Sequence, residues 1–579
     1  MYLRNKKIVS SLVCFMMVIS LFMPFNSFAT EEKQTLTGTT KAIVKEVKTK
    51  EEILKEDIEK YLEKGNFKYN DSTKIMDCIK KEIDFISIND FHGNVTEDAS
   101  EKGKNMGMSK VINAVKTYKK ENPNTIALSA GDSYQGTAMS NLTYGAPVSK
   151  MYNEVGIVAS AIGNHEFDWG TKWMNGWAKD GNFEFLASNI VDAKTLKPVE
   201  FAKPYKIVEQ DGIKIGLIGL TTPQTAFQTL PEYVKDYKFT DVKEAATKWA
   251  KYLKSGEAKE GKVDLVIALT HIGSYQNYET GEITGEVVDR GLCEIAELDA
   301  IISAHTHQSV SGFVNKKPVV QGYKYGRALG KLTVLFDENN ELLGMIPKVD
   351  TLYKRKSELI ADANGDKIYK EFDEKLKPIL SEIVGSTKED LSHERHSDKG
   401  TTLLGNLVSE IIREKADVQI GLMNEGGLRT SIAKGDITIG NLYEVLPFDN
   451  TLVSMDITGE QLKKVIENGI NNPQIGWIEV AGLKVNYDLT KEFGNRVIDM
   501  HLLDGTKIEM NKTYSVCTND FMASGGDNFD FKGATNYDDT KMPIRDVVKD
   551  YIKEVKVIDY TFEQPLNNVA KETEVKDAA

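Results

Sequence analysis

The segment from Gly163 to Asp168 gathers several side chains that can bind a metal ion or move a proton. It follows the small, apolar run 158–162, which is typical of a buried strand, and it places an amide, an imidazole and two carboxylates within five positions. Such groups are costly to order at a strand end unless they bind something. Amide oxygen, imidazole nitrogen and carboxylate oxygen are all ligands of divalent cations. The alternative is a polar turn after a strand, and four further segments of the same kind argue against it.

Four other apolar runs also end in residues that can bind metals. The runs 83–88, 125–128, 263–269 and 298–302 are followed in turn by Asp90 and His92, by Asp132, by His271, and by His305 and His307. Strand alternation puts both members of each pair on one face. The chain has only eight histidines, and five of them stand in these junctions and in the 163–168 segment. One strand-end histidine is more often structural, but five of them predict ligands for two divalent ions. Such a centre suits the hydrolysis of phosphate esters.

The segments between these runs predict the scaffold that positions the ligands. Helical spacing covers 108–118 and 241–253, and two hairpin-like segments, 205–220 and 319–336, are expected to complete the sheets. Strands that alternate with helices indicate an α/β layer domain. Ligands at the carboxyl ends of several strands would then meet at one edge of the sheet.

The chain beyond residue 396 has a different character. Residues 358–384 are mainly helical, with Pro378 expected to end or kink a helix, and they are predicted to connect two domains. Three later segments, 424–429, 446–450 and 521–527, each place a turn shaped by Gly or Pro beside aromatic or charged residues. This combination suits a pocket in which rings stack and an arginine holds an anion. The alternative for any one of these segments is a turn with an apolar core residue.

Charge and the N-terminal segment predict where the protein works. The 579-residue chain carries a net charge of −13, so nonspecific binding of nucleic-acid polymers is not expected. Residues 1–29 combine a basic start, an apolar run and the small residues Ser27 and Ala29, which predicts a secretory signal cleaved between Ala29 and Thr30. An uncleaved membrane anchor is the alternative. After cleavage no membrane span is expected, and the protein is predicted to be secreted or associated with the cell surface.

The remaining segments predict no chemistry. Cys78, Cys293 and Cys517 are widely spaced, which excludes a disulfide framework and a Cys-rich zinc site. One disulfide and three single thiols both stay open. Residues 30–80 are rich in lysine and glutamate, with helical spacing over 51–63, as in a spacer or a peripheral helix. Residues from 563 onward are polar and are expected to form a loose tail.

Taken together, the motifs resemble the bacterial 5'-nucleotidase family, which includes UDP-sugar hydrolases and 2',3'-cyclic-nucleotide phosphodiesterases. They are Asn-Asp-x-His-Gly, Gly-Asp-x-x-x-Gly, Gly-Asn-His-Glu-Phe-Asp, Thr-His-x-Gly and His-x-His, followed by Asn-x-Gly-Gly-x-Arg, Leu-Pro-Phe and Phe-x-x-x-Gly-Gly-Asp. The resemblance implies an α/β, two-domain fold, in which a four-layer α/β/β/α calcineurin-like metallophosphoesterase sandwich is joined by a helical linker to an α+β nucleotide-binding domain. The expected parts are a signal peptide (1–29), a charged spacer (30–80), the metallophosphoesterase domain (81–350), the linker (351–395), the C-terminal domain (396–550) and a tail (551–579).

The resemblance also implies a role for each site residue. Asp90, His92, Asp132 and His307 are expected to hold one divalent ion (zinc, manganese, cobalt or similar), and Asp132 to bridge to a second ion on Asn164, His271 and His305. His165 and Asp168 resemble the family's catalytic dyad. The expected substrate contacts are Asn424 and Arg429 near the phosphate, Phe448 and Phe521 around the base, Asn450 on the base and Asp527 on the ribose. The family's Glu before Leu404-Gly405-Asn406-Leu407 is replaced by Thr401. The nearest basic residues are Arg395 and Lys399, so the second phosphate-binding cation stays open, with Arg395 as the candidate.

The implied function is export followed by hydrolysis of nucleoside 5'-monophosphates to nucleoside and phosphate. Asp168 favours this activity, because several 2',3'-cyclic phosphodiesterase relatives carry Asn there. The alternatives are a 2',3'-cyclic-nucleotide phosphodiesterase with 3'-nucleotidase activity, a UDP-sugar hydrolase, and a surface nucleotide-binding protein that has lost catalysis. The complete ligand set and dyad argue against the last of these. The expected partner is a small nucleotide, and both domains must meet for catalysis, which relatives achieve by a domain rotation.

Overall fold

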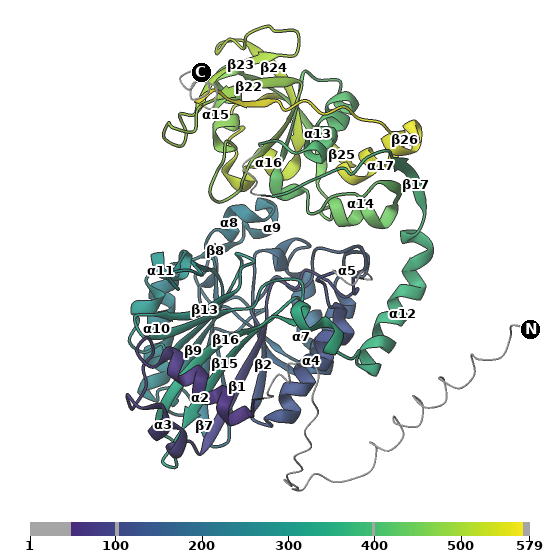
Figure 1. Ribbon diagram of the computed structural model, residues 1–579. Coiled ribbons are helices and arrows are strands. Elements are labelled where there is room, and N and C mark those ends of the chain that lie inside the picture. Colours follow the sequence, from purple (N-terminus) through teal and green to yellow (C-terminus); the bar gives the residue numbers. More distant parts are fainter. Residues whose placement is uncertain (1–47, 99–102, 396–399, 571–579) are drawn as a thin grey trace, which may run out of the picture. The chain divides into compact units, whose positions relative to one another are not determined.

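Two six-stranded sheets carry the first half of the chain in the computed structural model, which describes residues 48–98, 103–395 and 400–570 (Figure 1). The first sheet has the order β16-β15-β1-β2-β3-β4 and the second β13-β14-β12-β9-β7-β6. The strands of the first are β1 (Lys81–Ile88), β2 (Thr125–Ser129), β3 (Ile157–Ala161), β4 (Glu184–Leu186), β15 (Leu329–Phe336) and β16 (Leu342–Asp350). Those of the second are β6 (Tyr205–Gln210), β7 (Ile213–Thr221), β9 (Leu265–Gly273), β12 (Ala300–Ala304), β13 (Val310–Val314) and β14 (Lys317–Gln321).

An apolar core fills the space between the two sheets, and helices cover their outer faces. Phe85 and Leu128 of the first sheet share this core with Leu217 and Ile302 of the second. The outer face of the first sheet packs on α4 (Gly107–Glu121), α6 (Ala146–Val155) and α7 (Met174–Gly181), and that of the second on α10 (Val242–Ser255) (Figure 1). Strands buried on both faces read as continuous apolar runs, which explains the predicted strands. The predicted four-layer α/β/β/α order is therefore confirmed.

Parallel pairing brings the ends of the ligand-bearing strands to one edge. β1, β2, β3 and β4 run parallel, as do β7, β9, β12 and β14. The segments with Asp90, Asp132 and Asn164 follow β1, β2 and β3 directly. The sequence predicted that His271 follows its strand. The strand β9 instead extends to Gly273, so His271 lies within it.

One of the two predicted hairpins is present and the other is wrong. β6 and β7 pair as an antiparallel hairpin within 205–220. In 319–336, however, β14 pairs in the second sheet and β15 in the first, so the segment crosses between the layers. A Cβ atom on Gly322 would lie 2.7 Å from the amide nitrogen of Gly330. The chain can therefore make this crossing only where side chains are absent, a constraint that strand patterning does not reveal.

The second half of the chain forms an α+β domain after the helix α12 (Ala363–Leu380). Pro378 stands in the last turn of α12, and the helix ends two residues later. A five-stranded sheet of order β21-β18-β24-β20-β25 follows. Its strands are β18 (Ile420–Asn424), β20 (Thr451–Thr458), β21 (Ile478–Ala481), β24 (Thr513–Asn519) and β25 (Thr535–Pro543), and the helices beside it are α13 (Leu403–Ala416), α15 (Gly459–Asn468) and α17 (Ile544–Val555).

Two small sheets complete this domain, and one of them includes residues predicted to be a tail. The first has the order β19-β17-β26, with β17 (Ile383–Thr387), β19 (Gly435–Thr438) and β26 (Val557–Ile558). The second has the order β23-β22-β27, with β22 (Leu483–Tyr487), β23 (Val497–Leu502) and β27 (Leu566–Asn568). The chain therefore does not become a loose tail at 551 or 563, because α17 continues to Val555 and β27 pairs with β22.

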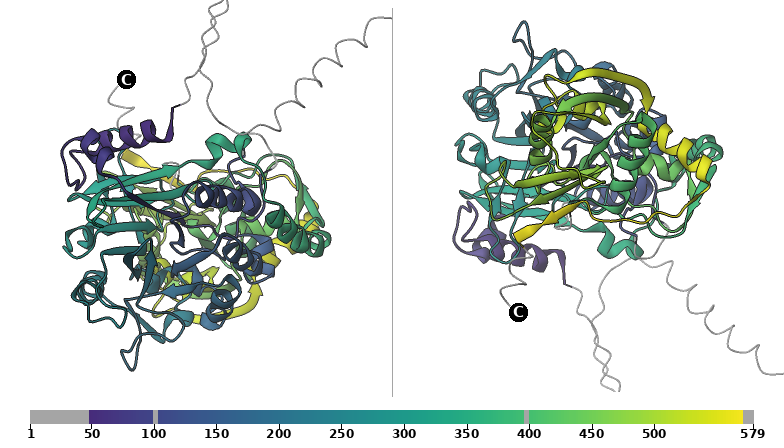
Figure 2. Two further views of the ribbon diagram at one scale, coloured as in Figure 1. Left: turned by 90° about the horizontal axis from the view of Figure 1, so that it is seen from below. Right: turned by 90° about the horizontal axis from the view of Figure 1, so that it is seen from above.

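The segment before β1 is partly helical, and its described part from Leu54 onward packs on the edge of the first sheet at β15 and β16. From Leu54 onward the chain forms one compact unit. Ile58 and Tyr61 of α2 (Lys50–Tyr61) share an apolar cluster with Leu343 and Ile346 of β16. Figure 2 shows α2 in purple beside the teal strands of the sandwich. The predicted signal peptide and its cleavage site fall outside the described residues. Within the described ranges, none of the helices is long and apolar enough to cross a membrane.

The three cysteines of the described chain are free thiols. Cys293 and Cys517 are buried and Cys78 is half-buried. Of the two alternatives left by the sequence, the structure therefore has three single thiols.

Candidate active site

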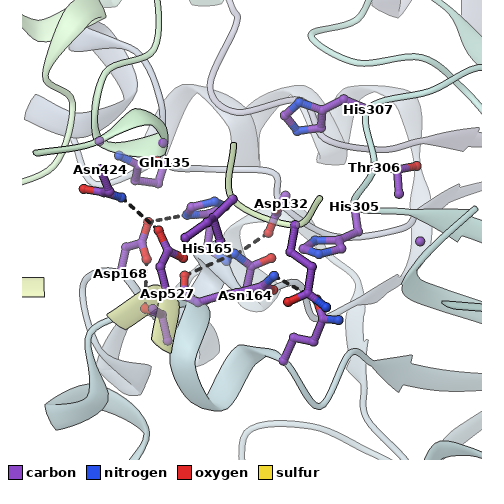
Figure 3. A pocket seen from close by; sticks show the side chains of 18 of the residues that line it. Asp132, Gln135, Asn164, His165, Asp168, His305, Thr306, His307, Asn424 and Asp527 are labelled. Atoms are coloured by element: carbon purple, nitrogen blue, oxygen red, sulfur yellow. Dashed lines mark hydrogen bonds and ion pairs between the residues drawn. The ribbon is translucent and has the colours of Figure 1, made fainter. Parts of the chain in front are cut away.

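Two groups of potential metal ligands lie at the carboxyl ends of the strands. One group contains Asp90, His92 and His307, and the other contains Asp132, His271 and His305. Within each group the potential ligand atoms all lie within 4.8 Å of one another. Figure 3 shows Asp132, Asn164, His305 and His307 around one cavity. The structure thus brings together six of the seven predicted ligands, three in each group, and their binding of metal stays a prediction.

Asp132 lies between the two groups. Its Oδ2 atom is 3.6 Å from Nε2 of His92 and 3.1 Å from Nε2 of His271. The carboxylate therefore faces one imidazole from each group, which is the placement required of a ligand that bridges two cations.

The hydrogen bonds of His271 indicate that a cation belongs beside it. Its Nδ1 atom is 2.8 Å from the carbonyl oxygen of Ala130 and must carry a proton to donate. The neutral ring then directs the lone pair of Nε2 at the Asp132 carboxylate, an unfavourable contact. Without a metal, a second proton must bind Nε2 and stand between the ring and the carboxylate. Burial lowers the pKa of His271, but the charge of Asp132 outweighs burial and raises this pKa to about 10.

Asn164 adds a second observation in favour of a cation. Its Oδ1 atom and Nε2 of His271 are both buried and lack a hydrogen-bond partner. Buried polar atoms are otherwise almost always paired. Imidazole nitrogen, amide oxygen and carboxylate oxygen together are a donor set for divalent cations. The residues present therefore fit metal ions in both groups, while the donor set does not specify which ion.

Five of the ligand-bearing residues have left-handed backbone conformations. The backbone angle φ is 48° at Asp90, 48° at His92, 52° at Asp132, 74° at His305 and 56° at His307. Non-glycine residues adopt this region rarely, and each costs about 1–3 kcal/mol unless the surroundings hold it. Such strain, concentrated in one cluster, is typical of a site in which backbone geometry aims the side chains.

Glu166 is a buried residue whose role the sequence did not predict. Its carboxylate accepts hydrogen bonds from the backbone N–H groups of Asp132, Ser133 and Gly163, at 2.8, 2.7 and 2.6 Å. It thereby ties the loop after β2 to the loop after β3. Burial raises the pKa of Glu166 to about 7, and the charge of Asp132 adds to this. The sequence showed a carboxylate in the cluster, but only the fold shows that it binds backbone.

His165 and Asp168 form the predicted pair. Nδ1 of His165 is 2.7 Å from Oδ2 of Asp168 (Figure 3). Oδ1 of Asp168 accepts a hydrogen bond from the hydroxyl of Thr229 at 3.0 Å. Burial lowers the pKa of His165, but the carboxylates of Asp168 and Asp132 outweigh it, so the pKa lies above its ordinary value. The pair therefore favours a protonated imidazole with a fixed ring orientation. Thr229, which orients Asp168, carried no signal in the sequence.

The residues predicted to bind substrate line the same cavity as the dyad. This cavity has a volume of about 930 Å³, enough for a nucleotide. Of the predicted site residues it is lined by Asp132, Asn164, His165, Asp168, His305, His307, Arg395, Asn424, Arg429, Phe448, Asn450, Phe521 and Asp527. The predicted residues that are absent from the lining are Asp90, His92 and His271, which are buried ligand-group members.

Several of these side chains already have partners. Phe448 stacks on His165, with ring centroids 5.8 Å apart. Asn424 donates to Oδ2 of Asp527 at 3.0 Å and accepts from Asn519 at 2.9 Å. Burial raises the pKa of Asp527 to about 6. Asn424 is therefore arranged to hold Asp527, while its predicted contact with phosphate stays a prediction.

Two arginines are placed in the cavity without an acidic partner. Arg395 has a buried Nε atom with no hydrogen bond, and Arg429 donates only to the carbonyl oxygen of Gly426, at 3.3 Å, among the residues that the structure describes. Burial lowers the pKa of Arg395, and the positive charge of Arg429 adds to this. Two half-buried guanidinium groups that form no ion pair among the described residues favour an anionic ligand.

Comparisons with known proteins agree with this geometry. A calcineurin-like phosphoesterase model matches residues 83–309, and a model of the 5'-nucleotidase C-terminal domain matches residues 383–533. The chain is 30% identical to the 5'-nucleotidase of Vibrio cholerae over 475 residues, covering 75% of this chain and 83% of that protein. A crystal structure of a 5'-nucleotidase precursor from Thermus thermophilus is similar, with a TM-score of 0.73, 26% identity and coverage of 84% and 99% of the two chains.

One relative is much longer than this chain. Endonuclease YhcR of Bacillus subtilis is 32% identical, and the match covers 76% of this chain but 37% of that protein. The chain therefore spans little more than a third of the length of this relative.

Proposed function

The chain belongs to the 5'-nucleotidase family, and on this basis we propose that it is an exported, dimetal hydrolase that cleaves nucleoside 5'-monophosphates to nucleoside and phosphate. The observation that carries the proposal is the shared cavity: ligand-group members, the His165–Asp168 pair and two aromatic side chains line one space. A phosphate at the ligand groups and a base between the rings of Phe448 and Phe521 would together occupy it.

The ligand groups would hold two divalent cations. One cation would be held by Asp90, His92 and His307. The other would be held by His271, His305 and Asn164. Asp132 would contact both cations. When bound, two such cations polarise phosphoryl oxygens and lower the pKa of water for an in-line attack.

The chain's own residues would supply the remaining functions. Asp168 accepts from Nδ1 of His165, so the protonated ring can donate from Nε2 to the phosphoryl group or the leaving oxygen. Arg395 and Arg429 would bind the phosphate as charge-assisted donors. Stacking on Phe448 and Phe521 holds a flat base by its faces, so we expect tolerance among nucleobases.

The test is product formation by the purified chain with and without added divalent metal. AMP, UDP-glucose and 2',3'-cyclic AMP are compared, and products are detected directly, because the first cleavage of the last two releases no phosphate. Metal-dependent turnover that is fastest on AMP supports the proposal. A preference for cyclic AMP or UDP-glucose would assign the chain to another branch of the family. Tight nucleotide binding without turnover would favour a binding protein.

Export has its own test. N-terminal sequencing of the protein recovered from the culture medium or the cell surface should begin at Thr30. Retention of residues 1–29 in a membrane fraction would favour an anchor.

A further inference from the structure

Lys324 stands in the loop that crosses from β14 to β15, and this loop is tied to the first ligand group. The carbonyl oxygen of Tyr323 accepts a hydrogen bond from Nδ2 of Asn89 at 3.0 Å. The amide of Tyr325 donates to the carbonyl oxygen of Asp90 at 2.8 Å. The residues on both sides of Lys324 are therefore fixed to the segment that carries Asp90.

The ammonium group of Lys324 is held without being neutralised. Nζ lies 4.8 Å from the ring centre of Tyr325 and 5.8 Å from that of Tyr323. The Tyr325 ring in turn contacts the rings of His92 and His307, with centroids 5.7 and 5.6 Å apart. Aromatic faces attract a cation but leave its charge in place. No carboxylate of the described chain forms an ion pair with this lysine.

Lys324 lines the same cavity as His307, Arg395 and Arg429. Burial lowers the pKa of Lys324, which reflects the cost of holding an ammonium group out of water without a counter-anion. Lys324 and the two arginines are three cationic side chains of this cavity that form no ion pair among the described residues. The fourth, Arg290, pairs with Glu286. A group of half-buried cations without ion pairs is costly unless an anion joins it.

We propose that Lys324 is a third phosphate-binding residue, whose ammonium group contacts the phosphoryl group of the substrate and the orthophosphate product. Its link to Asp90 and its contact with Tyr325, whose ring contacts His307, put it at the ligand-group end of the cavity, away from any role in reading the base. A compact ammonium group imposes no plane on the oxygen that it contacts, unlike a guanidinium fork. It can therefore follow a phosphoryl oxygen as the group inverts. This inference rests on the proposed function, because it takes the anion to be a phosphate.

The experiment measures orthophosphate binding by calorimetry to the full chain loaded with Mn²⁺. We compare Lys324→Met and Lys324→Arg with Lys354→Met, which removes an exposed lysine outside the cavity lining. Loss of a charge-assisted contact predicts about 10- to 100-fold weaker orthophosphate binding for Lys324→Met. Lys324→Arg keeps the charge but not the compact ammonium group, so it should lose less orthophosphate affinity than Lys324→Met. Lys354→Met should be unchanged.

Adenosine, which lacks a phosphate, is the second ligand. Its affinity and the metal content should be unchanged in Lys324→Met. Unaltered orthophosphate binding in that variant would overturn the inference. Equal losses of adenosine and orthophosphate binding would also overturn it, since the lysine would then support the fold.

The outcomes also separate this inference from the proposed function. Lys324-dependent orthophosphate binding by a chain that hydrolyses no nucleotide would keep the inference and reject the function. Turnover of AMP together with orthophosphate binding that does not depend on Lys324 would keep the proposed function and reject the inference about Lys324.

Discussion

Nε2 of His271 lies 3.1 Å from Oδ2 of Asp132, while Nδ1 of the same ring is 2.8 Å from a carbonyl oxygen. A neutral imidazole in this position turns a lone pair toward a carboxylate, so either a metal ion or a second proton on the ring must mediate the contact. The same two residues therefore connect the stability of the fold to metal binding.

Removal of divalent metal is expected to destabilise the protein. The ligand groups would lose their shared cations, and a ligand present at about 100 times its Kd contributes about 2.7 kcal/mol to the free energy of unfolding. Scanning calorimetry with a chelator should show a lower Tm that recovers when Mn²⁺ or Zn²⁺ is added back. An identical Tm in both states would argue that no metal binds at Asp132 and His271.

Replacement of His165 should abolish most turnover without loss of metal. His165→Ala removes the donor that Asp168 orients, and general acid catalysis contributes about 10²- to 10⁴-fold. We expect kcat on AMP to fall by at least two orders of magnitude, with unchanged metal content by elemental analysis. A loss of only a few-fold would exclude His165 from proton transfer.

Glu166→Gln should weaken metal binding although Glu166 is in neither ligand group. An amide offers one acceptor oxygen where the carboxylate offers two, so an N–H group after β2 or β3 loses its partner. We expect metal affinity to fall by about 10- to 100-fold, as for other residues that orient ligands. Metal titration of this variant is compared with Glu260→Gln, which changes an exposed carboxylate. Equal affinities would show that the two loops hold their positions without Glu166.

Phe521→Ala should weaken nucleotide binding and spare orthophosphate binding. The loss of one stacking face costs about 1–3 kcal/mol. Gly526→Ala offers a second route to the same effect, because a Cβ there would lie 2.5 Å from the Phe521 ring and push it aside. Calorimetry with AMP and with orthophosphate distinguishes the two ends of the cavity. Unchanged AMP affinity in Phe521→Ala would place the base elsewhere.

Glu479 is expected to make stability fall as pH rises. Burial raises its pKa to about 8, against hydrogen bonds from Thr402 that lower it, whereas an unfolded glutamate titrates near about 4.3. Between these values the folded state binds the extra proton, so the free energy of unfolding decreases with increasing pH. Glu479→Gln cannot titrate, and its Tm relative to the unmodified chain should rise steadily from pH 5 to pH 8. A constant difference across this range would mean that Glu479 is ionised when folded.

The metal-ligand candidates and the sheet layers could be predicted from the sequence because both depend on the same pattern, an apolar strand followed by polar residues. Strands buried on both faces must be apolar, and the polar residues that follow them mark the sheet edge, as Asp90, Asp132 and Asn164 do. Parallel pairing then determines that these ends meet. The same logic located His305 and His307.

The features that sequence reasoning missed all depend on contacts between distant segments. Thr229 reaches Asp168 from 61 positions away. Glu166 reaches Asp132 and Ser133, 34 and 33 positions away, only because the loops after β2 and β3 meet in space. Lys324 lies in a segment that the sequence predicted to be a hairpin. Its place beside the first ligand group follows only from the pairing of β14 and β15 in different sheets. Strand periodicity carries no information about such pairings.

The left-handed backbone at five ligand-bearing residues restricts any attempt to change the metal preference of this centre. Asp, Asn and His tolerate that conformation better than other side chains, and each also offers a donor atom. Glycine fits the backbone but donates nothing, and β-branched residues fit poorly. A selection library for altered metal preference should therefore sample Asp, Asn and His at positions 90, 92, 132, 305 and 307. Such a library contains few sequences and avoids most of the substitutions that would fail through misfolding.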